Sequence, residues 1–191
     1  MATEPIRNKK HIRQLAEYYL NKGKLRNYLL IILGVYTALR ISDLLSLKWG
    51  DVYNFELGEF RKHINLTEKK TGKAKSIAVN KQAVRALKKY FNTRGGFKKN
   101  GDYIFSNNRK TNAAISRVQA WRIIRDAGEA VGLGRVSCHS LRKSFGYHAW
   151  RAGVPAPVLM DIFNHSSYEV TRRYLGVCQD DRDEVYLETA Y

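Results

Sequence analysis

The sequence predicts a single α+β domain that is mainly helical and contains one small antiparallel β-hairpin. Three observations support this prediction. Most apolar residues recur at the three- and four-residue spacing of amphipathic helices. One short segment instead follows the shorter period of strands. No repeat, low-complexity tract or linker divides the 191 residues, a length that suits one domain with a sizeable core.

The first quarter of the chain is predicted to be helical. The apolar side of an amphipathic opening helix is made by Ile12, Leu15, Tyr18 and Tyr19. A break at Lys24 or Asn27 separates this helix from a more apolar one over residues 28–39. Ser42 is then placed to cap a third helix, whose first turn carries Asp43.

The apolar pattern changes from that of a helix to that of a strand after Trp49. Residues 60–67 and 74–79 are predicted to be two strands. The basic connection between them, residues 69–73, contains Gly72, which is typical of a hairpin turn.

Capping residues and glycines predict the next helices. Asn80 caps a helix whose apolar side is formed by Ala83, Val84, Leu87 and Tyr90. Residues 94–102 have the composition of an exposed loop. A long helix through residues 115–127 is expected to end at Gly132 and Gly134.

Three further helical segments complete the prediction. One runs from Ser140 to Ala152, and Pro155 and Pro157 open the next. The last segment holds Tyr174 and its surroundings.

The charge of the chain indicates a polyanionic partner. The sequence has 34 Lys and Arg against 17 Asp and Glu, a net charge of +17 and a pI near 10.0. A phosphate backbone is the commonest partner for such a surface. The sequence contains no apolar run of about 18 residues and no signal-peptide pattern. We therefore expect a cytoplasmic protein with no membrane partner.

Neither a disulfide framework nor a metal site is expected. The two cysteines, Cys138 and Cys178, are too few for such a framework. Cys138 directly precedes His139, but no metal-ligand spacing accompanies the pair. The acidic residues are scattered and form no cluster for magnesium. The expected chemistry thus uses neither a metal nor a cofactor.

Two short motifs place an arginine about one helical turn from a group that can assist it. His139 and Arg142 present imidazole and guanidinium on one helix face, and a guanidinium can hold two phosphate oxygens. In the other motif, the carboxylate of Asp43 stands where the first motif has an imidazole. This carboxylate can orient Arg40 or a nearby histidine. Each motif alone is equally well explained by solvated charge at a helix end or by a surface ion pair.

Three more residues complete a set suited to breaking a phosphodiester bond. Tyr174 supplies a phenol, which has an ordinary pKa of about 10 and needs positive charge and a proton acceptor to attack. His165 lies nine residues earlier, at a turn between helices. Lys70, in the hairpin connection, can protonate a leaving oxygen. Each of these residues alone has an ordinary structural explanation.

In their order and spacing, these motifs resemble those of the tyrosine recombinase, or phage integrase, family. Residues 37–49 resemble its first arginine box, and residues 139–142 its H-x-x-R box. Residues 164–174 resemble the box that ends at the nucleophilic tyrosine, and residues 70–79 the hairpin that carries the catalytic lysine. The resemblance covers nearly the whole chain.

The resemblance implies a reaction and a role for each matching residue. Tyr174 attacks the scissile phosphate, which gives a 3′-phosphotyrosyl link and a free 5′-hydroxyl. Arg40 and Arg142 hold the phosphate oxygens. His139 accepts or relays the phenol proton, and Lys70 protonates the leaving oxygen.

The same resemblance assigns supporting residues, and this sequence departs from the family pattern in two respects. His165 adds a hydrogen bond to the phosphate, and Asp43 is an accepted variant of the acid that follows the first arginine. Asn164 stands where the family usually has glycine, and asparagine tolerates a left-handed turn. Family members normally carry an N-terminal core-binding domain. We expect residues 1–191 to form the catalytic domain without it.

The implied partners are double-stranded DNA and further copies of the chain. Candidate DNA contacts are Arg117, Arg122, Lys143 and Arg173. The family forms a tetrameric synapse on DNA, and the tail of residues 179–191 is expected either to dock on a neighbouring subunit or to pack on its own domain. Two other functions stay open, a type IB topoisomerase and an accessory protein that binds DNA without cutting. A bacterium, a phage or another mobile element is the expected source.

Overall fold

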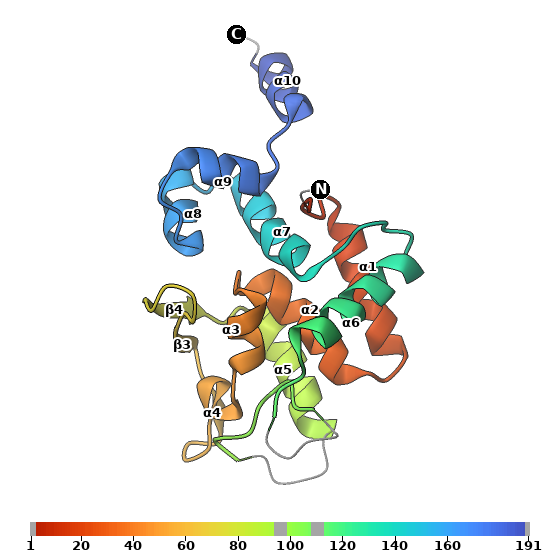
Figure 1. Cartoon of the computed structure of the whole chain (residues 1–191), viewed down its shortest axis with the longest axis vertical. Helices are drawn as coiled ribbons and strands as arrows, with labels where there is room; N and C mark the ends of the chain where they lie inside the picture. Colours follow the sequence, from red (N-terminus) through yellow and green to blue (C-terminus); the bar gives the residue numbers. More distant parts are fainter. Residues whose placement is uncertain (1–2, 94–98, 108–112, 190–191) are drawn as a thin grey trace.

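The computed structural model describes residues 3–93, 99–107 and 113–189 and is mainly helical (Figure 1). The described residues form ten helices and four short strands. In chain order these are α1 (Lys9–Asn21), α2 (Leu25–Tyr36), α3 (Ile41–Ser46), α4 (Trp49–Val52), β1 (Tyr53–Asn54), β2 (Glu59–Phe60), β3 (His63–Thr67), β4 (Ala74–Ala78), α5 (Lys81–Thr93), α6 (Arg117–Ala130), α7 (Cys138–Arg151), α8 (Ala156–Phe163), α9 (Tyr168–Leu175) and α10 (Gln179–Glu188). The predicted α+β class with a small antiparallel sheet is confirmed.

Helix α2 is the centre of the larger hydrophobic core. Its residues 29–35 are all buried, as expected for a helix that is apolar on every side. Helices α1, α5 and α7 pack around it, and α6 closes the core against α1. This core fixes the N-terminal end of α3 and the first turn of α7, from which functional side chains extend.

The β3–β4 hairpin lies beside this core and confirms the predicted hairpin, but its first strand begins at His63 and not at the predicted Phe60, which lies in β2. Its strands are antiparallel and pair from His63 with Ala78 to Thr67 with Ala74. Ile64 is fully buried, whereas both ends of the hairpin are exposed. An isolated two-stranded hairpin is barely stable in water, so its position depends on contacts with the rest of the domain.

A second, smaller hydrophobic cluster joins α7, α8 and α9 (Figure 1). Its buried members are Ala38, Leu159, Phe163 and Leu175. Gly146 of α7 allows the close approach, because a Cβ atom there would lie 2.6 Å from Cζ of Phe163 and 2.8 Å from Cδ2 of Leu175. This cluster positions the segment that runs from α8 to Tyr174.

Several predicted helix ends are wrong by a few residues. Helix α2, predicted over residues 28–39, begins and ends three residues earlier. It stops before Ala38, which has a left-handed backbone with φ of 53°. Ser42 does not cap α3, because Arg40 holds the N-cap position with an extended backbone and Ser42 lies in the first turn. Trp49 begins the separate short helix α4, and the sequence pattern does not predict the β1–β2 pair that follows.

Other predicted caps and ends are confirmed. The side-chain oxygen of Asn80 accepts a hydrogen bond from the backbone N–H of Ala83 at 2.9 Å, which caps α5. Helix α6 ends just before Gly132, whose φ is 72°. The predicted loop of residues 94–102 can be compared only from residue 99 onward, because residues 94–98 lie outside the described part of the chain.

Helix α10 projects from the rest of the domain (Figure 1). Two ion pairs tie it to the body, one between Arg7 and Asp181 at 3.3 Å and one between Arg151 and Glu184. Its apolar residues Val185, Tyr186 and Leu187 are 62%, 80% and 83% exposed. Packing on its own domain, the second of the two predicted arrangements, does not cover these side chains. None of the described helices has the length and apolar character needed to cross a membrane.

Candidate active site

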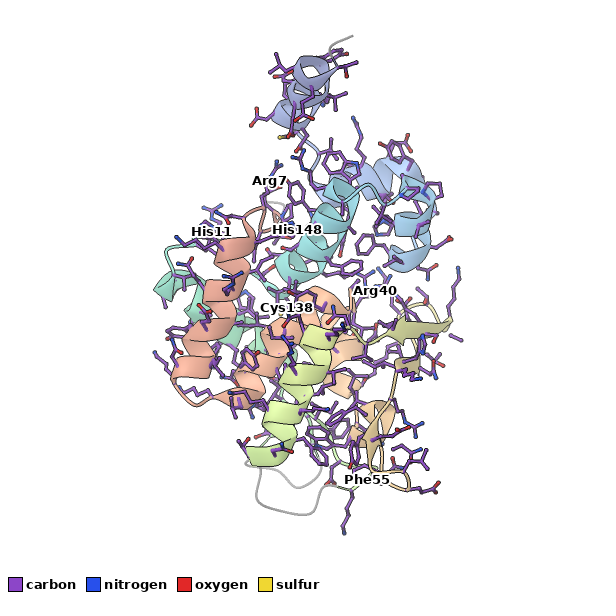
Figure 2. The ribbon with its side chains drawn as sticks, turned by 180° about the vertical axis from the view of Figure 1, so that it is seen from behind. Arg7, His11, Arg40, Phe55, Cys138 and His148 are labelled. Carbon is purple, nitrogen blue, oxygen red and sulfur yellow. The ribbon has the colours of Figure 1, made fainter. Side chains whose placement is uncertain are left out.

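Side chains from four separate segments meet beside the smaller hydrophobic cluster. Arg40 comes from the N-terminal end of α3 and lies between α7 and the β3–β4 hairpin (Figure 2). His139 and Arg142 come from the first turns of α7, His165 from the turn after α8, and Tyr174 from α9. The structure therefore brings together five of the residues predicted from the sequence motifs.

Local capping explains why these segments begin where they do. Ser137 caps α7, and its hydroxyl accepts hydrogen bonds from the backbone N–H groups of His139 and Ser140 at 3.2 and 3.4 Å. This cap starts α7 two residues before the predicted Ser140. Ser167 caps α9 in the same way, through the N–H of Val170 at 3.4 Å. Both caps set the residue at which a helix that carries site residues begins.

The two arginines share one backbone acceptor, the carbonyl oxygen of Phe163. Nη2 of Arg142 donates to it at 3.1 Å, and Nη2 of Arg40 at 3.4 Å. Nη1 of Arg142 also donates to the carbonyl of Ala38 at 2.6 Å. Arg142 is only 2% exposed, and its burial lowers the pKa of its guanidinium from the ordinary value. A guanidinium nevertheless stays charged in proteins, so two fixed positive charges lie side by side.

Tyr174 lies between the two histidines. Its hydroxyl is 3.4 Å from Nδ1 of His139, and its ring centroid is 4.8 Å from that of His139 and 4.9 Å from that of His165. Burial raises the pKa of Tyr174, while the charges of Arg142 and Arg40 act in the opposite direction. The phenol is therefore protonated at neutral pH and needs a proton acceptor in order to attack.

Both histidines are held in the neutral form that can accept a proton. Burial lowers the pKa of His139, and the charges of Lys143, Arg142 and Arg40 lower it further. Burial and the same two arginines lower the pKa of His165 to about 4. Nδ1 of His165 lies 3.1 Å from the hydroxyl of Thr171, which fixes the orientation of the ring.

Phe163 supports the site from behind. Its fully buried ring stacks on His165, with centroids 5.3 Å apart and an interplanar angle of 27°. The same ring contacts Tyr174 with a centroid distance of 4.8 Å. The ring of Phe163 therefore sets the positions of His165 and Tyr174, and the backbone carbonyl oxygen of Phe163 anchors both arginines.

The hairpin brings lysines to the site, but Lys70 is not one that reaches it. Lys70 is exposed in the connection, and in the described part of the chain its side chain forms no ion pair or hydrogen bond. Nζ of Lys75 donates to the carbonyl of Ile162 at 2.5 Å, and Nζ of Lys73 to Oδ1 of Asn164 at 2.8 Å. Burial lowers the pKa of Lys75, and the charge of Arg142 is the next cause.

Asp43 and Glu68 are acidic residues near the site with different partners. Asp43, 1% exposed, accepts a hydrogen bond from the backbone N–H of Lys69 at 3.0 Å and so holds the hairpin connection. Glu68, which no sequence motif predicts, pairs with Nη1 of Arg40 at 2.7 Å and is 2% exposed. Burial alone would raise the pKa of Glu68, but hydrogen bonds from Thr71 and Arg40 lower it to about 2.

Three of the four candidate DNA contacts are exposed. Arg117 and Arg122 lie on the surface of α6, and Arg173 lies on α9 next to Tyr174. Lys143 is different, because it is only 6% exposed and its Nζ donates to the carbonyl of Thr3 at 2.6 Å. Its ammonium group therefore faces the N-terminal segment.

No cluster of three His, Cys, Asp or Glu side chains suited to a metal ion occurs within residues 3–93, 99–107 and 113–189. The arrangement can instead hold an anion between two arginines, next to a phenol with a neutral imidazole within reach. These are the groups that nucleophilic attack on a phosphate ester needs.

Comparisons with known proteins agree with this geometry. The model of the phage integrase family matches residues 7–180. A probable integrase/recombinase, YoeC of Bacillus subtilis, is 38% identical over 183 residues, which are 96% of this chain and 94% of that protein. The tyrosine recombinase XerA of Pyrococcus furiosus is 29% identical over 87% of this chain, and the match spans 55% of XerA.

Solved structures show the same fold. A crystal structure of XerA recombinase matches with a TM-score of 0.79 and 25% identity over 100% of this chain and 68% of that one. XerH recombinase, bound to its palindromic difH substrate after cleavage, matches with a TM-score of 0.75 and 21% identity over 94% of this chain and 51% of that one.

Proposed function

This chain belongs to the phage integrase family, and we propose that it is a site-specific DNA recombinase in which Tyr174 is the nucleophile. One observation supports the role of Tyr174 above all. Its phenol is 3.4 Å from the neutral imidazole of His139 and lies next to two arginines that share one carbonyl anchor.

In the proposed cleavage step, the phenol oxygen of Tyr174 attacks the phosphorus of the scissile phosphate. A bond from this oxygen to phosphorus forms as the bond to the 5′ oxygen breaks, leaving a 3′-phosphotyrosyl link. His139 accepts the phenol proton, directly or through a relay. A 5′-hydroxyl of a partner strand then attacks the link, which restores the phosphodiester and frees the tyrosine.

Arg40 and Arg142 are proposed to bind the non-bridging phosphate oxygens, where negative charge develops. Their anchors at the carbonyls of Phe163 and Ala38 hold both groups in place before DNA binds. His165 adds a hydrogen bond to the phosphate. Asp43 acts indirectly, by holding the backbone of the hairpin connection.

Lys70 is proposed to protonate the leaving 5′ oxygen. Its exposure on the hairpin connection lets it reach a DNA strand that lies over the site. A substrate with sulfur in place of the 5′ oxygen tests this role, because a thiolate leaves without needing a proton. Lys70→Ala should cleave the oxygen substrate slowly and the sulfur substrate at nearly the wild-type rate. Lys75→Ala is the matched comparison, and rescue of that variant instead would assign the acid to Lys75.

Double-stranded DNA is the proposed substrate, bound through the basic surface. The net charge of +17 supplies the long-range attraction. Arg117, Arg122 and Arg173 are exposed and are proposed to contact phosphates. Among proteins of the same fold, XerH recombinase has been seen bound to its difH substrate.

Self-association on DNA is proposed to use α10. The helix carries exposed Val185, Tyr186 and Leu187 within an acidic sequence. A mainly apolar pocket of about 590 Å³ lies between α1, α2 and α7, and its lining includes Lys9 and Arg13, whose charges suit an acidic helix with apolar side chains. Leu187→Asp should prevent assembly of complexes larger than one subunit on DNA, whereas the exposed-charge control Glu188→Gln should assemble normally in analytical ultracentrifugation.

Covalent trapping on a pool of nicked duplexes with randomised sequence tests the function. Wild type should give a protein–DNA adduct that survives a denaturing gel, and Tyr174→Phe should give none while still binding DNA in a gel shift. Tyr168→Phe is a matched control, because Tyr168 is an exposed tyrosine of the same helix. An adduct with Tyr174→Phe would contradict the assignment. Binding by wild type without any adduct would favour an accessory protein.

A further inference from the structure

Asn164 uses its side chain for more than the turn in which it lies. It ends α8 with a left-handed backbone, φ 56° and ψ 50°. Glycine would satisfy this conformation without a side chain. The amide of Asn164 instead contacts both ends of the hairpin connection. Nδ2 donates to Oε2 of Glu68 at 3.3 Å, and Oδ1 accepts from Nζ of Lys73 at 2.8 Å.

Glu68 extends this contact into the site. The oxygen that accepts from Asn164 also pairs with Nη1 of Arg40 at 2.7 Å and accepts from the hydroxyl of Thr71 at 2.8 Å. Its other oxygen is 3.7 Å from Nζ of Lys75. One buried carboxylate thus joins the hairpin, the start of α3 and the turn that precedes His165. A carboxylate this deeply buried requires such partners, because an unpaired buried charge is costly.

The surroundings of this junction also link the hairpin to α8. A pocket of about 300 Å³ lies beside it, lined by residues of the hairpin on one side and of α8 and the following turn on the other. A further direct link between these two segments runs from Lys75 to the carbonyl of Ile162. The strands need such contacts, because a two-stranded hairpin alone is barely stable.

We propose that Glu68 and Asn164 form a polar latch that positions the hairpin connection, which carries Lys70, beside Arg40 and the turn that precedes His165. Both are positioning residues, since they act through the groups they hold. The part of the proposal that concerns catalysis rests on the proposed function. The part that concerns the hairpin does not, and the two can be measured separately.

The test uses Asn164→Gly, Glu68→Gln and the double variant in the full chain. Asn164→Gly keeps a residue suited to the left-handed turn and removes both side-chain contacts. Glu68→Gln keeps the shape and removes the charge. Glu59→Gln, an exposed glutamate of β2, is the control for loss of one negative charge.

Two readouts are needed. Amide hydrogen exchange of the free protein reports the hairpin, and we expect faster exchange over residues 63–78 in both single variants but not over α1 or α2. Single-turnover adduct formation on the nicked duplex pool reports catalysis. Each single variant should slow adduct formation about 10-fold. The double variant should be at most about threefold slower than either single variant, because both residues act through one contact.

Each other result argues against the latch. Unchanged hydrogen exchange in Asn164→Gly means that the side chain does not hold the hairpin. Faster exchange with an unchanged rate of adduct formation means that the hairpin need not be held for catalysis. Rate effects that multiply in the double variant mean that the two residues act independently. If wild type forms no adduct, the proposed function fails, and hydrogen exchange still decides whether the latch exists.

Discussion

Replacement of Gly146 by alanine should damage catalysis far more than stability. The added Cβ would lie 2.6 and 2.7 Å from two ring carbons of Phe163 and 2.8 Å from Leu175. Non-bonded carbons normally lie about 3.5–4.0 Å apart, so α7 and the segment leading to Tyr174 must separate by about 1 Å. Phe163 is fully buried and cannot turn away. Its ring and carbonyl would therefore carry the shift to His165 and to both arginines.

The expected magnitudes follow from opposing effects. Overpacking of this kind costs about 1–3 kcal/mol, and the better helix propensity of alanine offsets about 1 kcal/mol. The net loss of about 1 kcal/mol lowers the melting temperature by about 3 °C in a domain of this size. A displacement of about 1 Å at the reacting groups slows the reaction about 100-fold.

The assay pairs thermal denaturation with single-turnover adduct formation on the nicked duplex pool. Gly128→Ala is the matched control, because it adds a methyl group within helix α6, where the nearest atoms, 3.2 Å away, belong to Leu133 and Val136 and not to site residues. The reasoning is refuted if Gly146→Ala folds and cleaves within about threefold of wild type, since a shift of about 1 Å is expected to cost about 100-fold.

Two further predictions concern salt and pH. DNA binding should weaken about 10³-fold between 50 and 200 mM salt, because phosphate contacts release counterions; filter binding at several salt concentrations measures this, and a flat response would mean that the basic surface binds something else. Stability should fall as the pH drops below 6.5, because the pKa values of His139 and His165 are lowered in the folded protein, so the unfolded chain takes up protons that the folded protein does not. Each such histidine lowers the free energy of unfolding by up to about 1.4 kcal/mol for each unit by which the pH falls. Thermal denaturation between pH 7 and 5 should show a shallower decline in His165→Asn than in wild type, and parallel curves would contradict this origin.

The sequence alone predicts the fold correctly where short-range preferences decide the local structure. The cap at Asn80, the hairpin around Gly72 and the helix end before Gly132 follow from short-range preferences, and the structure confirms them. The helix ends near Ala38 and Ser42 do not follow, because tertiary contacts of Arg40 and Arg142 determine the backbone there.

The site was predictable to the extent that its residues lie in recognisable motifs. Arg40, Arg142 and Tyr174 do, and they meet in the structure. Glu68 does not, because its role comes from partners that are distant in sequence, such as Asn164. Lys75 was predictable, because it is two residues from the apolar Ile77 and therefore lies on the same, inward face of β4.

The acceptor that the two arginines share belongs to the main chain, which limits what mutagenesis can reveal. No codon change removes the carbonyl oxygen of Phe163, so an alanine scan would report only the loss of its ring. Both arginines would keep their anchor provided that the turn at Asn164 is preserved. A designer who transfers this centre to another scaffold must therefore copy a backbone conformation, and a list of side chains would not be enough.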